Sequence, residues 1–344
     1  PPAEAPLRLM TRAEYTRSVG VLFAGLDLPE LQLVAESTEA TFPGEARYQS
    51  VSSLALQAWI DGAHAVATAA VTGLGDWTDC GTGEVDCART AVLDLASRAY
   101  RRPLDSNESA ELVALFDGGL ADEGVGEGLR RGINAVLQSP NFLFRPEVGG
   151  PDGALDPHEL ATRLAFLLTG SLPDTELRAR ADDATLLEPE VLHAQAERLL
   201  ARPEARSQIR AFFDHWLELE GIDYVQLDPQ LFPEFDEALR RDLHESALRF
   251  AEAAFWDEDS LQTLWSGSFG FVNDRLAPMF GVEPPGSDDL VRLPLDPVER
   301  RGILTQPGML ASTSHGIVHS PIFRGVTVLE RIICSPTPAA PPGV

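Results

Sequence analysis

Apolar residues recur every three or four positions along most of this chain of 344 residues. That period places them on one face of an α-helix, whereas a half-buried strand would alternate at every second residue. Only 325–333 fits a strand as well as a helix, and its Val326, Leu329, Ile333 spacing favours the helix. We therefore expect a mainly α, multi-helical fold of two or three packed helical subdomains with little or no sheet. The helices expected are 9–23, 54–71, 87–100, 106–116, 128–137, 156–170, 192–200, 203–217, 235–256 and 273–280.

Local capping signals mark where several of these helices begin and end. Thr11 is followed three residues later by Glu14, and Asp156 by Glu159, which is the capping-box spacing. A proline directly after Asp156 suits the first helical position, and Gly170 suits the end of the same helix. The alanine-rich stretch 54–71 carries small and apolar residues throughout, which predicts a buried helix.

Turn-rich, polar segments indicate where the chain divides. The sequences PDG at 151–153 and EPPGSDD at 283–289 interrupt the helical pattern. No apolar run reaches the ~18 residues of a membrane-spanning helix. We expect an N-terminal helical region over 1–150, a central helical domain over 151–285, a C-terminal signature loop region over 286–335, and a proline-rich linker over 336–344 that leads to a further segment.

The charge balance is strongly acidic. The chain has 53 Asp and Glu residues against 27 basic ones, all of them arginine, and its net charge is -26. Such a surface repels phosphate backbones and anionic headgroups, so nucleic acid is excluded as the expected partner. The excess favours solubility and suits a cationic partner or a salty, extracellular setting. Genome composition with a solvated surface explains it equally well.

The cysteines and the start of the chain bear on the cellular compartment. Cys80 and Cys87 flank a turn-rich GTGEV segment, which predicts a disulfide, with two free thiols or a metal pair as alternatives. Cys334 stands alone, either free or paired beyond the chain's last residue. Because the chain opens at Pro1, we expect a processed product, with a signal or lipid anchor upstream.

The candidate functional loop is the polar stretch between two apolar runs near the C-terminus. Its His315 and His319 are four residues apart, a spacing that chelates a metal on a helix. Gly316 argues for a loop instead, and no carboxylate within the loop completes a ligand set. We therefore expect no metal site, and the two histidines are only weak candidates for one. We expect instead that the polar side chains of this loop cap neighbouring helices.

Ser320 and Arg324 follow in the same loop. Arg324 suits a bidentate clamp on a carboxylate or a haem propionate, or an ion pair with Glu330 that holds the loop in shape. Ser314 or Ser320 beside a histidine is a conceivable nucleophile, although neither serine lies in a G-x-S-x-G elbow. Catalytic residues therefore stay unassigned.

Arg101 and Arg102 stand at the end of the helix expected at 87–100. Cations there complement the helix dipole and its free carbonyls. The alternative is a site that binds an anion or a partner protein.

Six motifs resemble one family when they are taken in order. They are MTRAEYTRSVG at 10–20, SRAYRRPL at 97–104, LQSPNFLFRPE at 137–147, LDPHELATRLAFLLTGSLPDTEL at 155–177, FVNDRLAPMFG at 271–281 and RGILTQPGMLASTSHGIVHSPIFRGVTVLE at 301–330. The chain resembles, over nearly its whole length, the exported cytochrome-associated proteins of planctomycetes and myxobacteria. These consist of serial domains of unknown function and are commonly fused to c-type haem domains.

The resemblance implies an exported, helical module of a redox-associated, cytochrome c-linked protein, in the periplasm, on the outer membrane surface or outside the cell. It implies a partner: a haem-bearing domain on a C-terminal extension, or other protein subunits. This chain has no C-x-x-C-H motif, so we expect no cofactor within it. Whether it is an enzyme stays open. The alternatives are a non-catalytic extracellular or envelope scaffold and, least supported, a hydrolase using residues 312–324.

Overall fold

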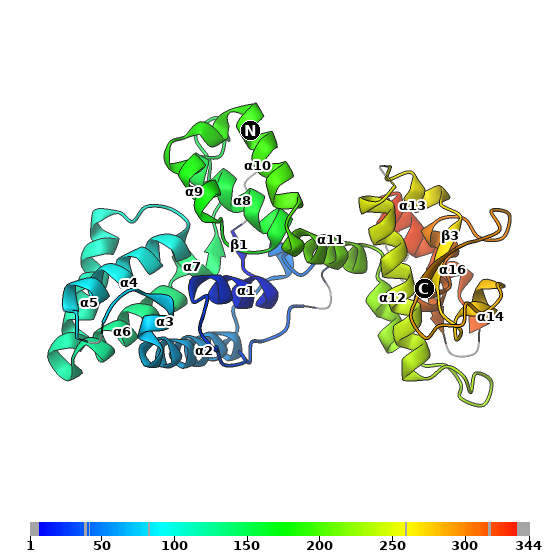
Figure 1. Ribbon diagram of the computed structural model, residues 1–344, viewed down its shortest axis with the longest axis horizontal. Coiled ribbons are helices and arrows are strands. Elements are labelled where there is room, and N and C mark those ends of the chain that lie inside the picture. The colour runs from blue at the N-terminus through cyan, green and yellow to red at the C-terminus, as the bar shows by residue number, and fades with distance from the viewer. Residues whose placement is uncertain are drawn as a thin grey trace, which may run out of the picture. The chain divides into compact units, whose positions relative to one another are not determined.

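The computed structural model has the mainly helical fold that the sequence predicts (Figure 1). The chain folds as two compact units, residues 1–208 and residues 209–344. The finer division expected near residues 150 and 285 stays a prediction. The structure describes residues 7–37, 40, 42–81, 83–258, 260–315 and 318–335.

The helix α6 (Val125–Gln138) is the central helix of a bundle of four helices in unit 1. It packs against α2 (Ser53–Thr72), α4 (Val85–Tyr100) and α5 (Ser106–Glu123) (Figure 1). Small residues let these helices approach closely. A Cβ on Gly119 of α5 would lie only 2.7 Å from a backbone oxygen of α6.

The helix α2 is less buried than its composition predicts. Small residues such as Ala63 and Ala67 face the core, whereas Leu54 and Leu56 near its start are exposed. The prediction of a buried helix therefore holds for one face of α2 and not for the other. One face of small side chains is enough for close packing, and the other face remains in solvent.

Local signals correctly placed the ends of several helices in unit 1. The helix α8 (Pro157–Thr169) begins with the capping box of Asp156 and Glu159, and Gly170 ends it in the left-handed region at φ 63°. The helix α1 (Arg12–Leu22) begins with the box predicted for it. The other elements of unit 1 are β1 (Arg8–Leu9), η1 (Ala46–Tyr48), α3 (Leu74–Trp77), α7 (Pro140–Leu143), β2 (Phe144–Arg145), α9 (Thr175–Asp182), η2 (Thr185–Leu187) and α10 (Pro189–Leu200), with β1 and β2 paired antiparallel.

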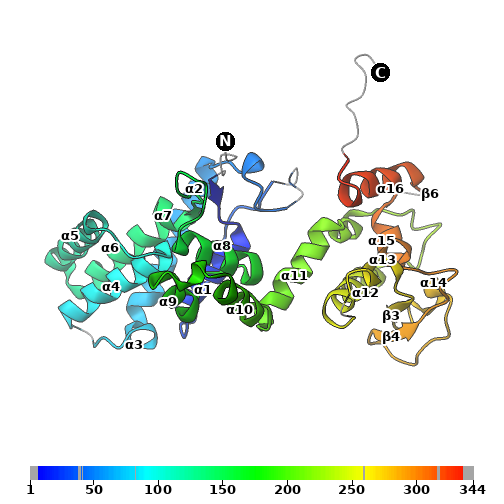
Figure 2. The ribbon, with the colours of Figure 1, turned by 90° about the horizontal axis from the view of Figure 1, so that it is seen from above.

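The long helix α12 (Glu237–Trp256) organises unit 2. It contacts the strand β3 (Phe269–Val272), which pairs antiparallel with β4 (Val291–Pro294) (Figure 2). It also carries α15 (Pro307–Ser312) on its surface. Residues on its buried face include Leu239, Leu243, Ala247, Phe250 and Ala254.

The remaining elements of unit 2 are short. The segment 325–333 is helical, as its spacing predicted, and includes one turn of π-helix. Within the described ranges, no helix has the length and apolarity that a membrane span requires. These elements are η3 (Leu219–Tyr224), α13 (Thr263–Ser266), α14 (Ala277–Phe280), η4 (Ile303–Thr305), β5 (Ser314–His315), β6 (Val318–His319), α16 (Pro321–Thr327) and the π-helix η5 (Val328–Ile332), while α11 (Pro203–Trp216) runs across the boundary between the units.

Candidate functional site

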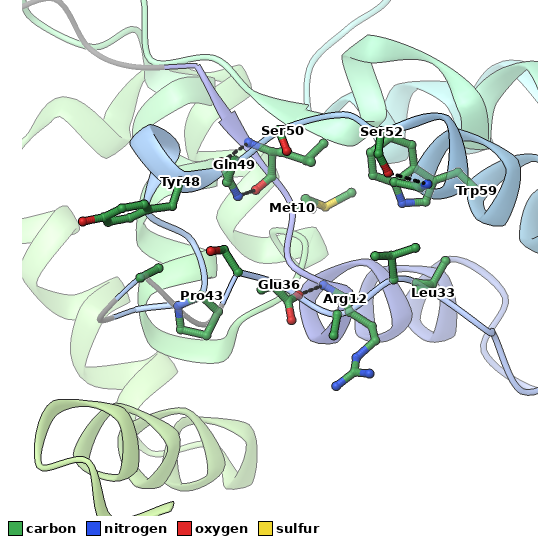
Figure 3. A pocket seen from close by; sticks show the side chains of 16 residues that line it. Met10, Arg12, Leu33, Glu36, Pro43, Tyr48, Gln49, Ser50, Ser52 and Trp59 are labelled. Atoms are coloured by element: carbon green, nitrogen blue, oxygen red, sulfur yellow. Dashed lines mark hydrogen bonds between the residues drawn. The ribbon is translucent and has the colours of Figure 1, made fainter. Parts of the chain in front are cut away.

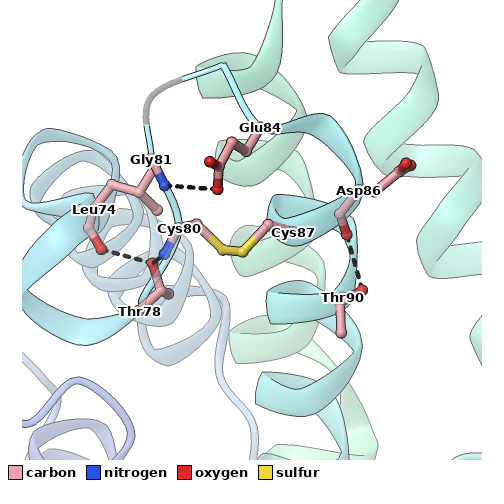
Figure 4. The surroundings of a disulfide bond; sticks show 8 residues. All are labelled: Leu74, Thr78, Cys80, Gly81, Glu84, Asp86, Cys87 and Thr90. Carbon is pink, nitrogen blue, oxygen red and sulfur yellow. Dashed lines mark hydrogen bonds between the residues drawn. A yellow bond between two sulfur atoms is a disulfide. The ribbon is translucent and has the colours of Figure 1, made fainter.

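A disulfide joins Cys80 to Cys87, as the sequence predicts (Figure 4). Their Cα atoms lie 5.6 Å apart, a normal separation for such a bond. Cys87 belongs to the first turn of α4, and Cys80 belongs to the loop that precedes it. The Glu84 carboxylate accepts a hydrogen bond from the Gly81 N–H at 3.0 Å and holds the same loop. Cys334 carries a free, exposed thiol.

Arg101 has a structural role at the end of α4. Its guanidinium donates to the carbonyls of Ala99 and Phe142 at 2.9 and 3.1 Å. It also donates to those of Asn141 and Phe144, each at 2.7 Å. Burial lowers the pKa of Arg101 to about 9, so the side chain stays protonated at neutral pH. Because Arg101 is buried and satisfied by backbone oxygens, the helix-end interpretation holds for it and the docking interpretation does not.

The motif at 301–330, called the signature segment from here on, enters the core of unit 2 through Gln306 and Gly308. Gln306 is buried, and its amide donates to the carbonyl of Phe269 on β3 at 3.0 Å. A Cβ at Gly308 would lie 2.2 Å from the Leu243 carbonyl oxygen of α12. Glycine is therefore required where α15 crosses α12.

The hydroxyl groups at and just after the end of α15 bond to carbonyls of the preceding turn. Ser312 and Thr313 donate to the Met309 carbonyl at 3.0 and 3.1 Å. Ser314 donates to the Leu310 carbonyl at 2.7 Å. A serine whose proton is held by a backbone oxygen lacks the base contact that a nucleophile needs. These bonds favour the capping interpretation of the loop.

The two histidines lie in the short hairpin of β5 and β6. Ser314 is opposite His319, and His315 is opposite Val318, so the histidines are not cross-strand partners. Their side chains lie outside the described residues, and the metal hypothesis for them stays a prediction. Elsewhere in the described part of the chain, no group of three or more histidine, cysteine or acidic side chains is placed to hold a metal ion.

Ser320 and Arg324 both help to position α16. The Ser320 hydroxyl accepts a hydrogen bond from the Phe323 N–H at 3.3 Å and caps the helix. The Arg324 Nε donates to the Thr313 hydroxyl at 3.4 Å, which links α16 to the end of α15. The expected pairing of Arg324 with Glu330, and its expected role as an anion clamp, stay predictions.

Trp216 fixes the π-helix η5 from the neighbouring helix α11. Its indole N–H donates to the Arg331 carbonyl at 2.8 Å, and the Arg331 side chain pairs with Glu218. Ile332 packs against the apolar core beside Trp216. Isolated π-turns often occur at functional sites, and this one lies at the end of the signature segment.

An apolar cavity of about 490 Å³ opens beside the signature segment. The sequence pattern did not predict it, because its wall at 225–235 carries no helical period. The available signal was the run LFPEF at 231–235, in which three apolar residues flank one proline and one glutamate. Its lining includes Val225, Phe232, Leu239, Met279, Ala311 and Ser314.

Unit 1 has a smaller cavity of about 240 Å³ between β1, the start of α1 and residues 33–59 (Figure 3). The Gln49 amide accepts from the Leu9 N–H at 2.9 Å and donates to the Leu9 carbonyl at 2.6 Å. The Glu36 carboxylate accepts from the Arg12 N–H. Polar groups at this cavity therefore fasten its walls to β1 and α1.

These features define a mainly helical protein of two compact units, with a disulfide in the first unit and a buttressed signature segment in the second. Three families of proteins of unknown function match it: PSD5 (DUF1595) at residues 87–147, PSD4 (DUF1592) at 155–282 and PSCyt3 (DUF1588) at 300–344. The chain thus belongs with the domain families typical of planctomycete cytochrome-associated proteins, as its motifs indicate. No curated protein and no solved structure matches it.

Proposed function

We propose that this chain is an exported module of a cytochrome c-linked redox protein, which docks or supports a c-type haem domain without holding haem itself. That domain lies on a C-terminal extension or on a partner subunit. The observation that carries the proposal is the match to PSCyt3 at 300–344. This family is typical of cytochrome-associated proteins, and the match covers the whole signature segment.

The contacts of the signature segment suit a supporting role. Gln306 and Arg324 bond to neighbouring elements of the same unit, and Ser312 bonds within its own helical turn. Trp216 fixes the far end of the segment. Side chains engaged in this way shape a firm surface and are not poised for proton transfer or nucleophilic attack.

Export is supported by the bond between Cys80 and Cys87. Disulfides persist in oxidising compartments and are rare in the reducing cytosol. We therefore propose the periplasm, the outer membrane surface or the extracellular space as the location. The net charge of -26 suits a cationic partner there.

A non-catalytic scaffold is the second candidate, and the acidic surface favours it. A chain with this charge can bind a cationic protein or polymer without any link to haem. A hydrolase has less support. Ser314 donates to a backbone carbonyl and Ser320 caps a helix, so each hydroxyl already has a structural role.

Isolation of the natural, full-length protein from its source tests the proposal. We expect a reduced-minus-oxidised spectrum of the c-type, with haem that stays covalently bound after denaturation, on the same polypeptide or on a subunit isolated with it. A preparation with no haem absorbance, from a gene with no C-x-x-C-H motif, would contradict the proposal. The non-catalytic scaffold would then be the better supported function.

A further inference from the structure

The cavity beside the signature segment has the size and character of a binding site. Its volume of about 490 Å³ lies within the range of roughly 300–1,000 Å³ that is usual for ligand pockets. Phe232, Phe235 and Leu239 line one part, and Met279 and Ala311 line another. The cavity therefore offers an apolar receptacle on unit 2.

Large apolar side chains are exposed in the wall segment 225–235 and at Tyr224 directly before it. Tyr224 is 81% exposed, Leu231 60% and Phe232 41%. Single exposed apolar residues are ordinary, but several of them grouped beside an apolar cavity indicate an interaction surface. Aromatic residues such as Tyr224 and Phe232 are also enriched at the centres of protein interfaces.

The longer stretch 218–237, which contains this wall, is acidic. Residues 218–237 contain seven Asp and Glu residues and no Arg or Lys. Glu234 lines the cavity, and Asp223 and Glu237 each lie two residues along the chain from a lining residue. All three are exposed, and none is in an ion pair with another described residue. The nearby Arg240 does not contact these acids; its guanidinium donates to the carbonyls of residues 222 and 225.

We propose that this cavity and its acidic rim form a docking site for a basic protein surface. An apolar group of the partner enters the cavity, and lysine or arginine side chains around it meet Asp223, Glu234 and Glu237. This inference rests on the proposed function, which supplies the class of partner, a c-type haem domain; the acids beside the cavity require that its docking face be basic.

The charge of the rim selects this occupant over three others. An anionic lipid surface and a second copy of this chain, with its net charge of -26, are both repelled by the acids. A small apolar ligand gains nothing from exposed carboxylates beside the cavity. A cationic protein gains from both parts, since charge complementarity speeds encounter and fixes orientation.

Calorimetric titration tests the site with two probes: a basic c-type cytochrome, and lysozyme as a basic protein without haem. Each is titrated at about 0.01 M and about 0.15 M salt. One variant, Leu231→Ser with Phe232→Ser, removes the exposed apolar groups. Another, Glu234→Gln with Glu237→Gln, removes two rim charges. The control, Glu123→Gln with Glu190→Gln, removes two charges from exposed positions in unit 1.

We expect cytochrome binding at low salt, weakened by salt and weakened about tenfold or more by either unit 2 variant. The control should bind like the unaltered chain. Circular dichroism checks that each variant is folded, which we expect because the substituted side chains are exposed.

The outcomes separate the docking site from the proposed function. Cytochrome binding that neither unit 2 variant weakens overturns the site and leaves the proposed function standing. Lysozyme binding of equal strength, with the same sensitivity to the variants, supports the site and contradicts the link to haem. Failure of both probes to bind at low salt overturns the site.

Discussion

At the scale of single residues, the buried charge of Arg101 stabilises the backbone around it by hydrogen bonding. Arg101 bonds four carbonyl oxygens, one near the end of α4 and three along α7 and the start of β2. Its lowered pKa of about 9 records the cost of burial, yet leaves the cation intact at neutral pH. Hydrogen bonds from a charged donor contribute more than neutral ones, which offsets part of that cost.

Arg101→Ala should therefore lower the free energy of unfolding by about 3 kcal/mol, because buried carbonyls lose their donor. Denaturant titration followed by circular dichroism measures the loss. Arg163→Ala is the control: its exposed side chain pairs with Glu147 at 3.6 Å, and removing it should cost less than about 1 kcal/mol. Equal effects of the two substitutions would contradict the structural role of Arg101.

His244 gives the stability of unit 2 a dependence on pH. Burial lowers its pKa, but a 2.8 Å hydrogen bond to Asp214 and the charges of Asp214 and Asp223 outweigh burial and the opposing charge of Arg210. The net pKa is raised, so the protonated form stabilises the fold below the unfolded pKa of about 6.5. That contribution is lost as the pH rises through the folded-state pKa.

His244→Gln should accordingly destabilise the protein more at a pH of about 5.5 than at about 8.5. Unfolding curves of both proteins at each pH give the comparison. A difference that stays constant with pH would show that the histidine acts only through packing.

At the scale of elements, close contacts explain the spacing of small residues. Gly308→Ala should lower stability by about 2 kcal/mol, because its Cβ would lie 2.2 Å from the Leu243 carbonyl and push α15 away from α12. Gly325→Ala is a matched control in α16, where no described residue beyond its own helical turn and chain neighbours lies within 4 Å of the added atom. It should be neutral or stabilising by up to about 1 kcal/mol. Thermal unfolding decides between these outcomes.

The disulfide is an element-scale constraint because it joins the loop after α3 to the first turn of α4. Cys80 and Cys87 are seven positions apart, and opening so short a loop should cost about 2–3 kcal/mol. Replacement of both cysteines by serine, followed by denaturant unfolding, measures this. Mass analysis of unreduced protein should find one free thiol, that of Cys334; three free thiols would remove the support for export.

The helices were predictable because their signals are local. The Asp156 capping box and the Gly170 stop can be found in a short stretch of sequence. The cavity was not predictable, because the exposure of Leu231 and Phe232 depends on how 225–235 lies against α12 and α15. The hydroxyl bond of Ser314 was hidden for a related reason: a sequence does not show which carbonyl a side chain reaches.

At the scale of the whole molecule, the net charge and the composition of the chain determine which experiments can detect a binding partner. The chain has no lysine, so amine-reactive cross-linkers have almost nothing to modify on it. Its net charge of -26 makes weak binding to many cations expected at low salt. A test of the cytochrome-linked function must therefore locate binding on the chain as well as detect it.

Hydrogen–deuterium exchange with and without a basic c-type cytochrome, read peptide by peptide at moderate salt, is the most direct test. The account predicts slowed exchange in unit 2 at 218–237 and in the adjoining first turns of α12, with unit 1 unchanged. Protection confined to unit 1, or no protection at a cytochrome concentration that saturates binding, would contradict the account.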